Sequence, residues 1–442
     1  MPSREGQSYY VPNTESDRRA MFAAIGAVSI DELFADIPKE HRNPPLKLPP
    51  PLSEMELREE MAALSAMDRT VDCMPGFLGG GAYHHFIPSA VQAIISRGEF
   101  LTSYTPYQAE ASQGTLHAMY EFQSLVCQLL GMEVANAGMY DGATALAEAA
   151  LMACRVTQRD TVAVLDTVSP VYRDVIRTYT EAQGVRASVV SSNEATPGPE
   201  TAALVVQYPN FLGYLEDMAS LEQATRKAGA LFVASTDPIA LGLFKSPADY
   251  GADIVTSEGQ PLGIPVSFGG PYVGLFATRM QHIRQVPGRI VGRTRDGQGR
   301  TGYVLTLQTR EQHIRRERAT SNICTSEALV ALAATVYMAL MGPAGLRHVA
   351  ELCYHKAHYA ASRIAGIPGF ALPVDGIFFK EFVVQCPIAP REMNRRLLDK
   401  GIIGGLDVSD HVPNGMLLCV TEMNTRPQID ALVAALQEVA VR

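Results

Sequence analysis

A glycine- and proline-rich turn at residues 259–271 is the stretch most suited to binding chemistry. A short apolar run at 252–256 precedes it and another at 273–277 follows it, which predicts a strand, a turn and a second strand. Glycine permits positive φ and close approach of a ligand or another chain, and α/β proteins usually hold ligands in loops at strand ends. The turn carries no lysine, since none occurs between Lys245 and Lys356.

Two further strand ends carry groups that could bind a charged ligand. Residues 134–145 read as a strand, a turn and a helix start, and the free amides of a helix N-terminus suit a phosphate or a carboxylate. A plain turn with Asp141 as helix cap, just before Gly142, explains the same residues. Asp237 follows a strand expected at 230–235. Its carboxylate could pair with the ring nitrogen of a cofactor, or Asp237 and Pro238 could simply form a turn.

Other groupings carry weaker signals. His355 and His358 share a helical face, with His348 and Cys353 nearby, but metal binding needs three or four converging ligands, so we predict no metal site. Residues 279–318 are rich in arginine and contain a loop at 296–299. These arginines could bind an anion or an acidic partner, or form a solvated face with local salt bridges. No nucleophile elbow or catalytic triad stands out.

The surrounding elements alternate between strand and helix, which implies a mostly parallel sheet covered on both faces. Predicted strands are 134–138, 161–166, 187–191, 202–207, 230–235 and 252–256, and the helices between them include 142–156, 169–183 and 217–228. Helices at 325–341, 343–365, 390–400 and 427–440, with strands at 378–385 and 416–421, indicate a smaller α+β domain. We therefore expect a large α/β domain at 71–320 and a C-terminal α+β domain at 321–442.

The first 70 residues form a separate N-terminal helical arm in this prediction. A proline-rich strap at 43–51 cannot continue a helix or a central strand, because proline lacks the amide hydrogen. A capping box, Ser53 with Glu56, starts the next helix. The strap could cross to a partner subunit or could lie on its own domain.

Composition narrows the function classes. The chain has 442 residues, 47% of them apolar, and a formal net charge of −9, which disfavours general nucleic-acid binding. Its seven cysteines include no CxxC pair, which favours a reduced protein. The polar first ten residues lack an apolar signal core, and no run of eighteen apolar residues occurs. We expect a cytoplasmic protein without a nucleic-acid or membrane partner.

Several long segments occur together in a characteristic order. They are Phe77–Gly81 with His84 and His85, then Tyr104–Gly114, Asn136–Ala145, Asp253–Gly274, Gln308–Arg316 and Ala319–Thr325. In this combination the chain resembles the P-protein of the glycine cleavage system, a glycine dehydrogenase (decarboxylating). The resemblance is to subunit 1, the α subunit of the split form, and covers nearly the whole chain after residue 14.

The resemblance implies the fold-type-I architecture of enzymes that depend on pyridoxal phosphate (PLP). It also implies an α2β2 assembly in which the homologous β subunit holds PLP on its lysine. Gln260 then stands at the lysine position and cannot form an imine, so no catalytic residue is expected in this chain alone. Asp237 matches the aspartate that pairs with the pyridine nitrogen. Asp237, Asp141 and Gly142 are thus candidates for a vestigial cofactor site.

The implied reaction is decarboxylation of glycine on the β subunit. CO2 leaves, and the aminomethyl group passes to the lipoyl group of the carrier H-protein. This chain would complete the pocket and shape the lipoyl entrance. Candidates to reach the partner's PLP phosphate are Thr320, Ser321 and Asn322, and candidates for the pocket wall are Tyr104, Tyr107, His84 and His85.

Two alternatives remain open at this stage. The chain could be a self-sufficient PLP enzyme that uses one of its other lysines, which are Lys39, Lys47, Lys227, Lys245, Lys356, Lys380 and Lys400. It could also be a structural pseudoenzyme that stabilises its partner and adds nothing to the pocket.

Overall fold

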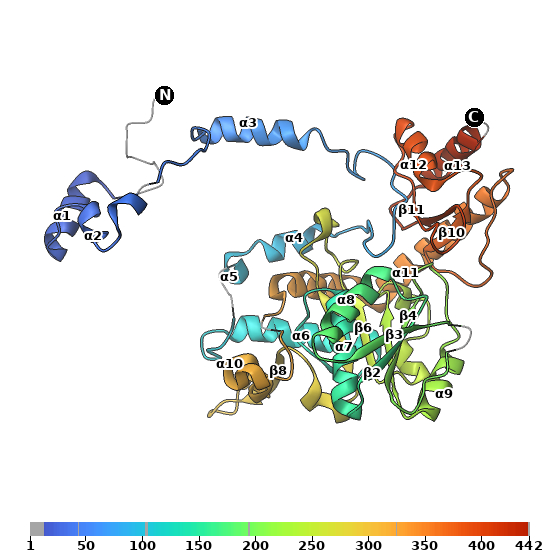
Figure 1. Ribbon diagram of the computed structural model, residues 1–442, viewed down its shortest axis with the longest axis horizontal. Helices are drawn as coiled ribbons and strands as arrows, with labels where there is room; N and C mark the ends of the chain where they lie inside the picture. Colours follow the sequence, from blue (N-terminus) through green and yellow to red (C-terminus); the bar gives the residue numbers. More distant parts are fainter. Residues whose placement is uncertain (1–12, 43, 102–104, 193–194, 324, 441–442) are drawn as a thin grey trace. The chain divides into compact units, whose positions relative to one another are not determined.

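The computed structural model describes residues 13–42, 44–101, 105–192, 195–323 and 325–440. The chain divides into two compact units, Met1–Arg69 and Thr70–Arg442, and each is described by itself (Figure 1).

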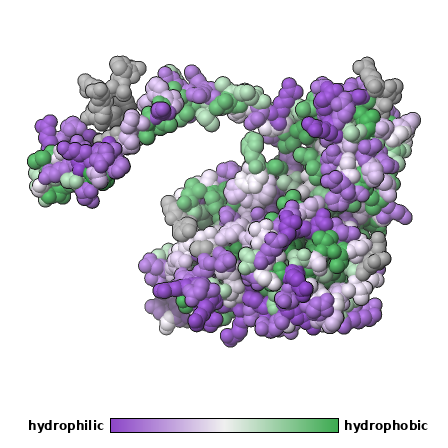
Figure 2. All heavy atoms as spheres, viewed as in Figure 1, coloured by the Kyte–Doolittle hydropathy of each residue, from purple (hydrophilic) through white to green (hydrophobic). Residues whose placement is uncertain are grey.

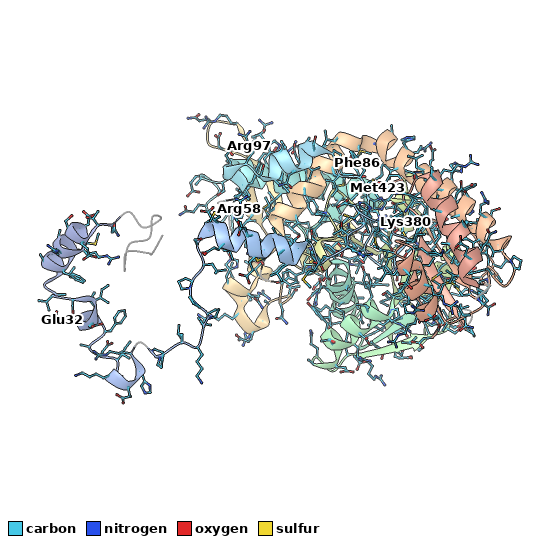
Figure 3. The ribbon with its side chains drawn as sticks, turned by 90° about the horizontal axis from the view of Figure 1, so that it is seen from above. Glu32, Arg58, Phe86, Arg97, Lys380 and Met423 are labelled. Atoms are coloured by element: carbon cyan, nitrogen blue, oxygen red, sulfur yellow. The ribbon has the colours of Figure 1, made fainter. Side chains whose placement is uncertain are left out.

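The first unit consists of short helices that bury nothing among themselves. Its helices are α1 (Glu15–Ile25), α2 (Ile30–Leu33), the 3₁₀ helix η1 (Lys39–His41) and α3 (Glu54–Ser65), and none of them contains a buried residue. Ser53 caps α3 through the predicted capping box with Glu56. Apolar side chains such as Phe34 and Met61 are exposed and lie among polar ones on this unit (Figures 2 and 3). Short helices of this kind gain most of their stability from packing against something else.

A seven-stranded sheet organises the second unit. Its strand order is β1-β7-β6-β5-β4-β2-β3. Strands β3, β2, β4, β5 and β6 run parallel, and β7 is antiparallel to β6. The predicted mostly parallel sheet is confirmed. The strands are β1 (Val134–Ala135), β2 (Thr161–Leu165), β3 (Arg186–Val190), β4 (Thr201–Tyr208), β5 (Leu231–Thr236), β6 (Ile254–Glu258) and β7 (Gly274–Thr278).

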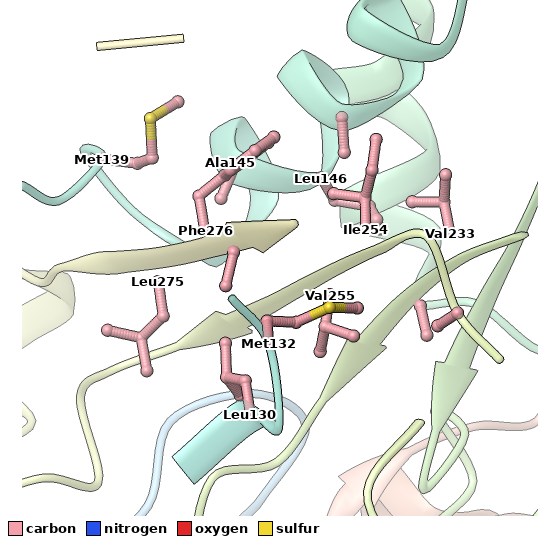
Figure 4. Close-up of a cluster of buried hydrophobic side chains, with 14 of the residues drawn as sticks. Leu130, Met132, Met139, Ala145, Leu146, Val233, Ile254, Val255, Leu275 and Phe276 are labelled. Atoms are coloured by element: carbon pink, nitrogen blue, oxygen red, sulfur yellow. The ribbon is translucent and has the colours of Figure 1, made fainter. Parts of the chain in front are cut away.

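Apolar residues on both faces of the strands explain why the sheet is covered on both sides. Ile254 and Phe276 lie on the face that meets Ala145 and Leu146 of the helix after β1, while Leu275 and its neighbours point to the opposite face (Figure 4). This alternation is the two-residue period of a strand. The helices around the sheet are α4 (Ser89–Ile95), α5 (Gly98–Leu101), α6 (Gln113–Leu130), α7 (Gly142–Thr157), α8 (Pro170–Glu181) and α9 (Met218–Lys227).

A second hydrophobic core forms around a three-stranded sheet of order β10-β12-β11. Its elements are β10 (Glu381–Gln385), α12 (Pro390–Asp399), β11 (Leu406–Asp407), β12 (Gly415–Cys419) and α13 (Arg426–Ala440). Helix α11 (Ala328–Ala365) supplies residues to both cores. It breaks at Gly342, just before Pro343, where the sequence predicts a boundary between two helices. By length and composition α11 could cross a membrane, and its role in both cores accounts for its apolar character.

The arginine-rich segment differs from the prediction. The predicted loop at residues 296–299 forms the tip of a hairpin between two strands that were not predicted, β8 (Ile290–Arg295) and β9 (Thr301–Thr306). The carboxylate of Asp296 accepts hydrogen bonds from the amides of Gln298 and Arg300. A short helix, α10 (Gln312–Arg315), follows. No strands were predicted here, because Arg293 and Arg295 with Thr294 occupy the exposed half of β8 and leave only a short apolar run at its start.

Gly213, in the turn after β4, packs directly against the backbone at the beginning of β10. Its φ is +94°, and a Cβ at this position would lie 2.1 Å from the carbonyl oxygen of Glu381. We predict that Gly213→Ala lowers the free energy of unfolding by about 3 kcal/mol or more, because the strain of positive φ adds to a backbone clash. Gly184→Ala is the matched control. It has a φ of +71° and no atom within 4 Å, so it should cost only about 1–2 kcal/mol. Equal losses in denaturant unfolding would contradict the proposed clash.

Candidate functional site

A cavity of about 50 Å³ lies where strands β4, β5 and β6 end. This is the edge of the sheet at which α/β proteins usually bind ligands. Its walls come from the glycine loop (residues 79–83), from the strand ends and from the residues around the start of β10, and they include Tyr83, Asp237, Glu258, Lys380 and Glu381.

A buried ion pair occupies one side of this cavity. The Nζ of Lys380 lies 2.6 Å from Oδ2 of Asp237, and the two side chains are 1% and 11% exposed. Burial lowers the pKa of Lys380, but the Asp237 carboxylate together with the neighbouring Cys419 and Cys353 raises that pKa above its ordinary value. The other carboxylate oxygen of Asp237 accepts from the amide of Ile239. Asp237 therefore forms the turn, as one interpretation predicts, and it also faces the cavity, while its pairing with a cofactor stays a prediction.

Aromatic and imidazole groups surround the ammonium of Lys380. Its Nζ lies 3.5 Å from the ring centroid of Tyr83 and 3.1 Å from Nε2 of His85. Nδ1 of His85 is 2.7 Å from Oε2 of Glu422. Burial and the neighbouring ammonium lower the pKa of His85, which indicates a neutral ring that accepts at Nε2 and donates at Nδ1. Lys380 lies inside the second unit, in the same region as Phe86 (Figure 3).

A carboxyl group from the chain itself meets the N-terminus of α7. Asp141 caps this helix in a capping box with Thr144, as one of the two sequence interpretations predicts. The amide of Gly142 donates to Oε2 of Glu258 at 2.8 Å, and the amide of Gln260 donates to Oε1 at 2.9 Å. Burial raises the pKa of Glu258 to about 8, against the opposing effect of these two amides.

Gln260 is a fully hydrogen-bonded structural residue. Its Oε1 accepts from the amide of Tyr83 at 2.8 Å, and its Nε2 donates to the carbonyls of Tyr83 at 2.9 Å and Ile264 at 2.7 Å. The side chain is 1% exposed. It ties the glycine loop to the turn at 259–271, since both of its donor hydrogens are used and its oxygen accepts one hydrogen bond.

Two glutamates from distant parts of the sequence complete the glycine loop. Glu381 accepts from the amide of Gly80 at 2.6 Å and from the hydroxyl of Tyr83 at 2.7 Å. Glu422 accepts from the amide of Phe86 at 2.7 Å. Burial raises the pKa of Glu381. Burial also acts to raise the pKa of Glu422, but the hydrogen bonds that its carboxylate accepts from His85 and from the amide of Phe86 contribute to lowering that pKa to about 2.

Three side chains of types that can bind a metal lie close together next to this network. The histidine pair noted in the sequence, His355 and His358, is not among them. Ligand atoms of His85, Cys353 and Glu422 all lie within 4.8 Å of one another. The Lys380 ammonium beside His85 opposes a bound cation there. His358 stacks on Phe378 and lies 3.1 Å from its carbonyl oxygen, so packing accounts for that residue.

The remaining predicted site residues do not line the cavity. Tyr107 is 51% exposed, with the guanidinium of Arg289 5.6 Å from its ring centroid. Nε2 of His84 lies 3.8 Å from a carboxylate oxygen of Asp72. Tyr104 lies outside the described residues.

The segment 320–322 lies near α10, also away from the cavity lining. The amide of Thr320 donates to the carbonyl of Arg310, and Oδ1 of Asn322 accepts from Gln312. Ser321 is half-buried, and its Oγ accepts from the amide of Ile323. These three residues therefore do not line the cavity of their own chain, and Ser321 also forms a side-chain hydrogen bond with Glu148.

Sequence reasoning missed most of the groups that fill the cavity. Glu258 lies just before the predicted turn at 259–271 and was assigned no role from the sequence. Lys380 was named there only as one of the lysines that a self-sufficient PLP enzyme could use. Tyr83, Glu381 and Glu422 have no sequence signal, because their function depends on contacts between segments more than 150 residues apart along the chain.

The cavity does not fit the cofactor that the resemblance implies. Its volume of about 50 Å³ is far below the roughly 300–1,000 Å³ typical of small-molecule sites. Asp237 already has a cation, the first amide of α7 already has an acceptor, and Gln260 has no amine to react with an aldehyde. We therefore derive no reaction step from a cofactor bound to this chain.

Comparison with known proteins gives a consistent result. The family model described as "Glycine cleavage system P-protein" matches residues 8–436. The chain is 53% identical to a probable glycine dehydrogenase (decarboxylating) subunit 1 of Thermomicrobium roseum, with 97% of this chain and 99% of the relative covered. A probable subunit 1 of Desulforamulus reducens is 50% identical, with 97% and 99% covered.

Solved structures agree in fold. An inhibitor-bound glycine decarboxylase (P-protein) of the glycine cleavage system superposes with a TM-score of 0.94 at 45% identity, covering 98% of this chain and 100% of that chain. A sphingosine-1-phosphate lyase of Burkholderia pseudomallei gives a TM-score of 0.64 at 15% identity, covering 91% and 94%. The neighbours are PLP-dependent fold-type-I enzymes, so this chain has the predicted architecture.

The elevated pKa of Glu258 predicts a specific pH dependence of stability. Its pKa is about 8 in the folded chain against an ordinary value of 4.5, so between these values the folded chain binds the extra proton. The free energy of unfolding then falls as pH rises through this window and levels off above it. The full shift corresponds to about 3–5 kcal/mol.

Glu258→Gln cannot ionise and should lack this part of the pH dependence. In urea unfolding, the variant should gain stability relative to the unmodified chain between about pH 5 and about pH 8. Asp407→Asn, at an exposed carboxylate, is the control and should leave the slope over this window unchanged. Parallel pH profiles for Glu258→Gln and the unmodified chain would contradict the predicted shift.

Proposed function

This chain belongs to the glycine cleavage system P-protein family, and from that premise we propose that it is the α subunit of the two-chain form, which does not itself bind PLP. A homologous lysine-bearing β subunit would hold PLP in an α2β2 enzyme of the cytoplasm. There glycine would lose CO2 and pass its aminomethyl group to the lipoyl group of the H-protein. This chain would be inactive without its partner.

The observation that carries this proposal is the engagement of Gln260 within its own chain. Gln260 stands on the turn where the resemblance implies a lysine, and its amide binds the glycine loop at Tyr83. A residue in this role closes the pocket and offers no nucleophile. The reaction of the P-protein would then take place on a second chain that carries the lysine, because this chain has no lysine at that position.

The alternative of a self-sufficient PLP enzyme is less well supported. Lys380 is the lysine that lines the cavity, but its Nζ binds Asp237. A pyridine nitrogen would need that carboxylate, and the reactive aldehyde of PLP lies across the ring from the nitrogen. Lys245 and Lys356 are engaged elsewhere, with the ring of Tyr250 and the carbonyl of Glu422.

The N-terminal unit is our candidate for contact with the partner. Its helices bury no residue among themselves, and several of their large apolar side chains are exposed, among them Ile25, Phe34 and Leu64. Exposed apolar surface of this kind marks an interaction site. Either path of the proline strap, across to a partner subunit or along its own domain, would cover these side chains, and we propose the first.

The first test is to locate the cofactor. Adding PLP, reducing with borohydride and measuring masses should give no specific pyridoxyl-lysine adduct on this chain alone. In the complex purified with its lysine-bearing homologue, one adduct should form, on the homologue. A stoichiometric adduct on any lysine of this chain would overturn the proposal and favour the self-sufficient enzyme.

The same complex tests the N-terminal unit. Deleting residues 1–69 should abolish co-purification with the homologue, because the exposed apolar helices are removed, while residues 70–442 keep both hydrophobic cores. Undiminished co-purification of the truncated chain would assign the contact to another surface.

Ser321 separates a contributing subunit from a purely structural one. If its hydroxyl reaches the partner's PLP phosphate, Ser321→Ala removes a hydrogen bond to a charged group, worth about 1.5–3 kcal/mol. We expect roughly a tenfold or larger rise in the PLP dissociation constant of the assembled enzyme, with assembly unchanged by gel filtration. Ser362→Ala, at an exposed position of α11, is the matched control. Identical PLP affinity for both variants would favour the structural pseudoenzyme.

A further inference from the structure

We propose that this chain fills its cofactor pocket with its own polar groups, so that Lys380 replaces the pyridinium of PLP and Glu258 replaces the phosphate. This inference rests on the proposed function in one respect, namely that PLP belongs to the partner. It adds a physical reason why the pocket of this chain is stable without a cofactor and closed to one.

The first replacement concerns positive charge. Asp237 is 11% exposed, and a buried carboxylate without a cation is costly. In PLP enzymes the ring nitrogen supplies that cation. Here the ammonium of Lys380 lies 2.6 Å from Oδ2 of Asp237 and against the face of Tyr83 at 3.5 Å, where a cation is also stabilised by the ring.

The second replacement concerns the phosphate position, which the carboxyl group of Glu258 fills as a neutral acid below about pH 8. The N-terminus of a 16-residue helix such as α7 attracts an anion. Its Gly142 amide is already bound to Oε2 of Glu258. A Cβ on Gly142 would lie 2.9 Å from Cβ of Glu258 and 2.5 Å from the hydroxyl of Tyr172, so these two side chains leave no room at the amide for a phosphate.

A third group completes the set. Gln260 stands at the position implied for the lysine, and its amide bonds close the glycine loop over the turn. Each of the three attachments that a PLP enzyme offers, to the ring nitrogen, the phosphate and the aldehyde, therefore has a resident side chain: Lys380, Glu258 and Gln260. Loss of the lysine alone would leave the other two attachments free to bind the cofactor.

The test opens both ends of the pocket and offers a probe that cannot react with lysine. The probe is 4′-deoxypyridoxine 5′-phosphate, which has the ring nitrogen and the phosphate but no aldehyde. The unmodified chain should show no thermal stabilisation by millimolar probe. The variant Glu258→Ser/Lys380→Met should be stabilised in a saturable way, and adding Asp237→Asn should weaken its binding at least tenfold. Binding by the unmodified chain, or no binding by a folded double variant, would overturn the inference.

A charge-pair cycle covers the case in which the double variant does not fold. Lys380→Met leaves the Asp237 carboxylate buried without its cation, whereas Asp237→Asn/Lys380→Met removes both charges. The single lysine variant should therefore melt at a lower temperature than the double one. If the double variant melts no higher, Lys380 is not the cation that Asp237 requires. Neither result depends on which subunit carries the trapped cofactor, so a failure here is distinguishable from a failure of the proposed function.

Discussion

Burying Asp237 at the end of a central strand requires a positive charge beside it, and the rest of the site follows from this constraint. Lys380, the residue just before β10, supplies this positive charge. The ion pair therefore connects the seven-stranded sheet, which contains β5, to the three-stranded sheet, which contains β10. The same ammonium keeps His85 neutral, and His85 in turn binds Glu422 beyond β12. A single buried carboxylate thus fixes the relative positions of β5, β10 and the chain that follows the glycine loop.

The fold could be predicted in large part because its signals are local. Apolar runs that begin about 15–28 residues apart, most of them separated by helical patterns, specify a parallel sheet, and the break at Gly342 is visible as a Gly-Pro pair. The hairpin at 290–306 was missed because the exposed half of β8, with Arg293 and Arg295, shows no apolar alternation, and its pairing is stabilised by a turn around Asp296. The two-residue strand β11 is too short to give a pattern.

The site could be predicted only where a residue's role is tied to its place on a strand end or to the family resemblance. Asp237, Asp141, Gly142 and Gln260 were found in this way. Their partners could not be, because the contacts of Lys380 with Asp237 and of Glu381 with Gly80 join segments far apart in the sequence. A lysine next to a strand has many ordinary explanations, and only the folded chain shows which carboxylate it meets.

The Lys380–Asp237 pair also separates the stability of this chain from the supply of vitamin B6. A ligand that binds only the folded state stabilises it in proportion to the logarithm of its concentration once the site is largely filled, so an enzyme that holds PLP becomes less stable when the vitamin is scarce. An ion pair within one chain contributes the same free energy at every concentration of the vitamin. If PLP is held by a partner subunit, as proposed, the contribution of this ion pair to the stability of this chain does not change during vitamin shortage.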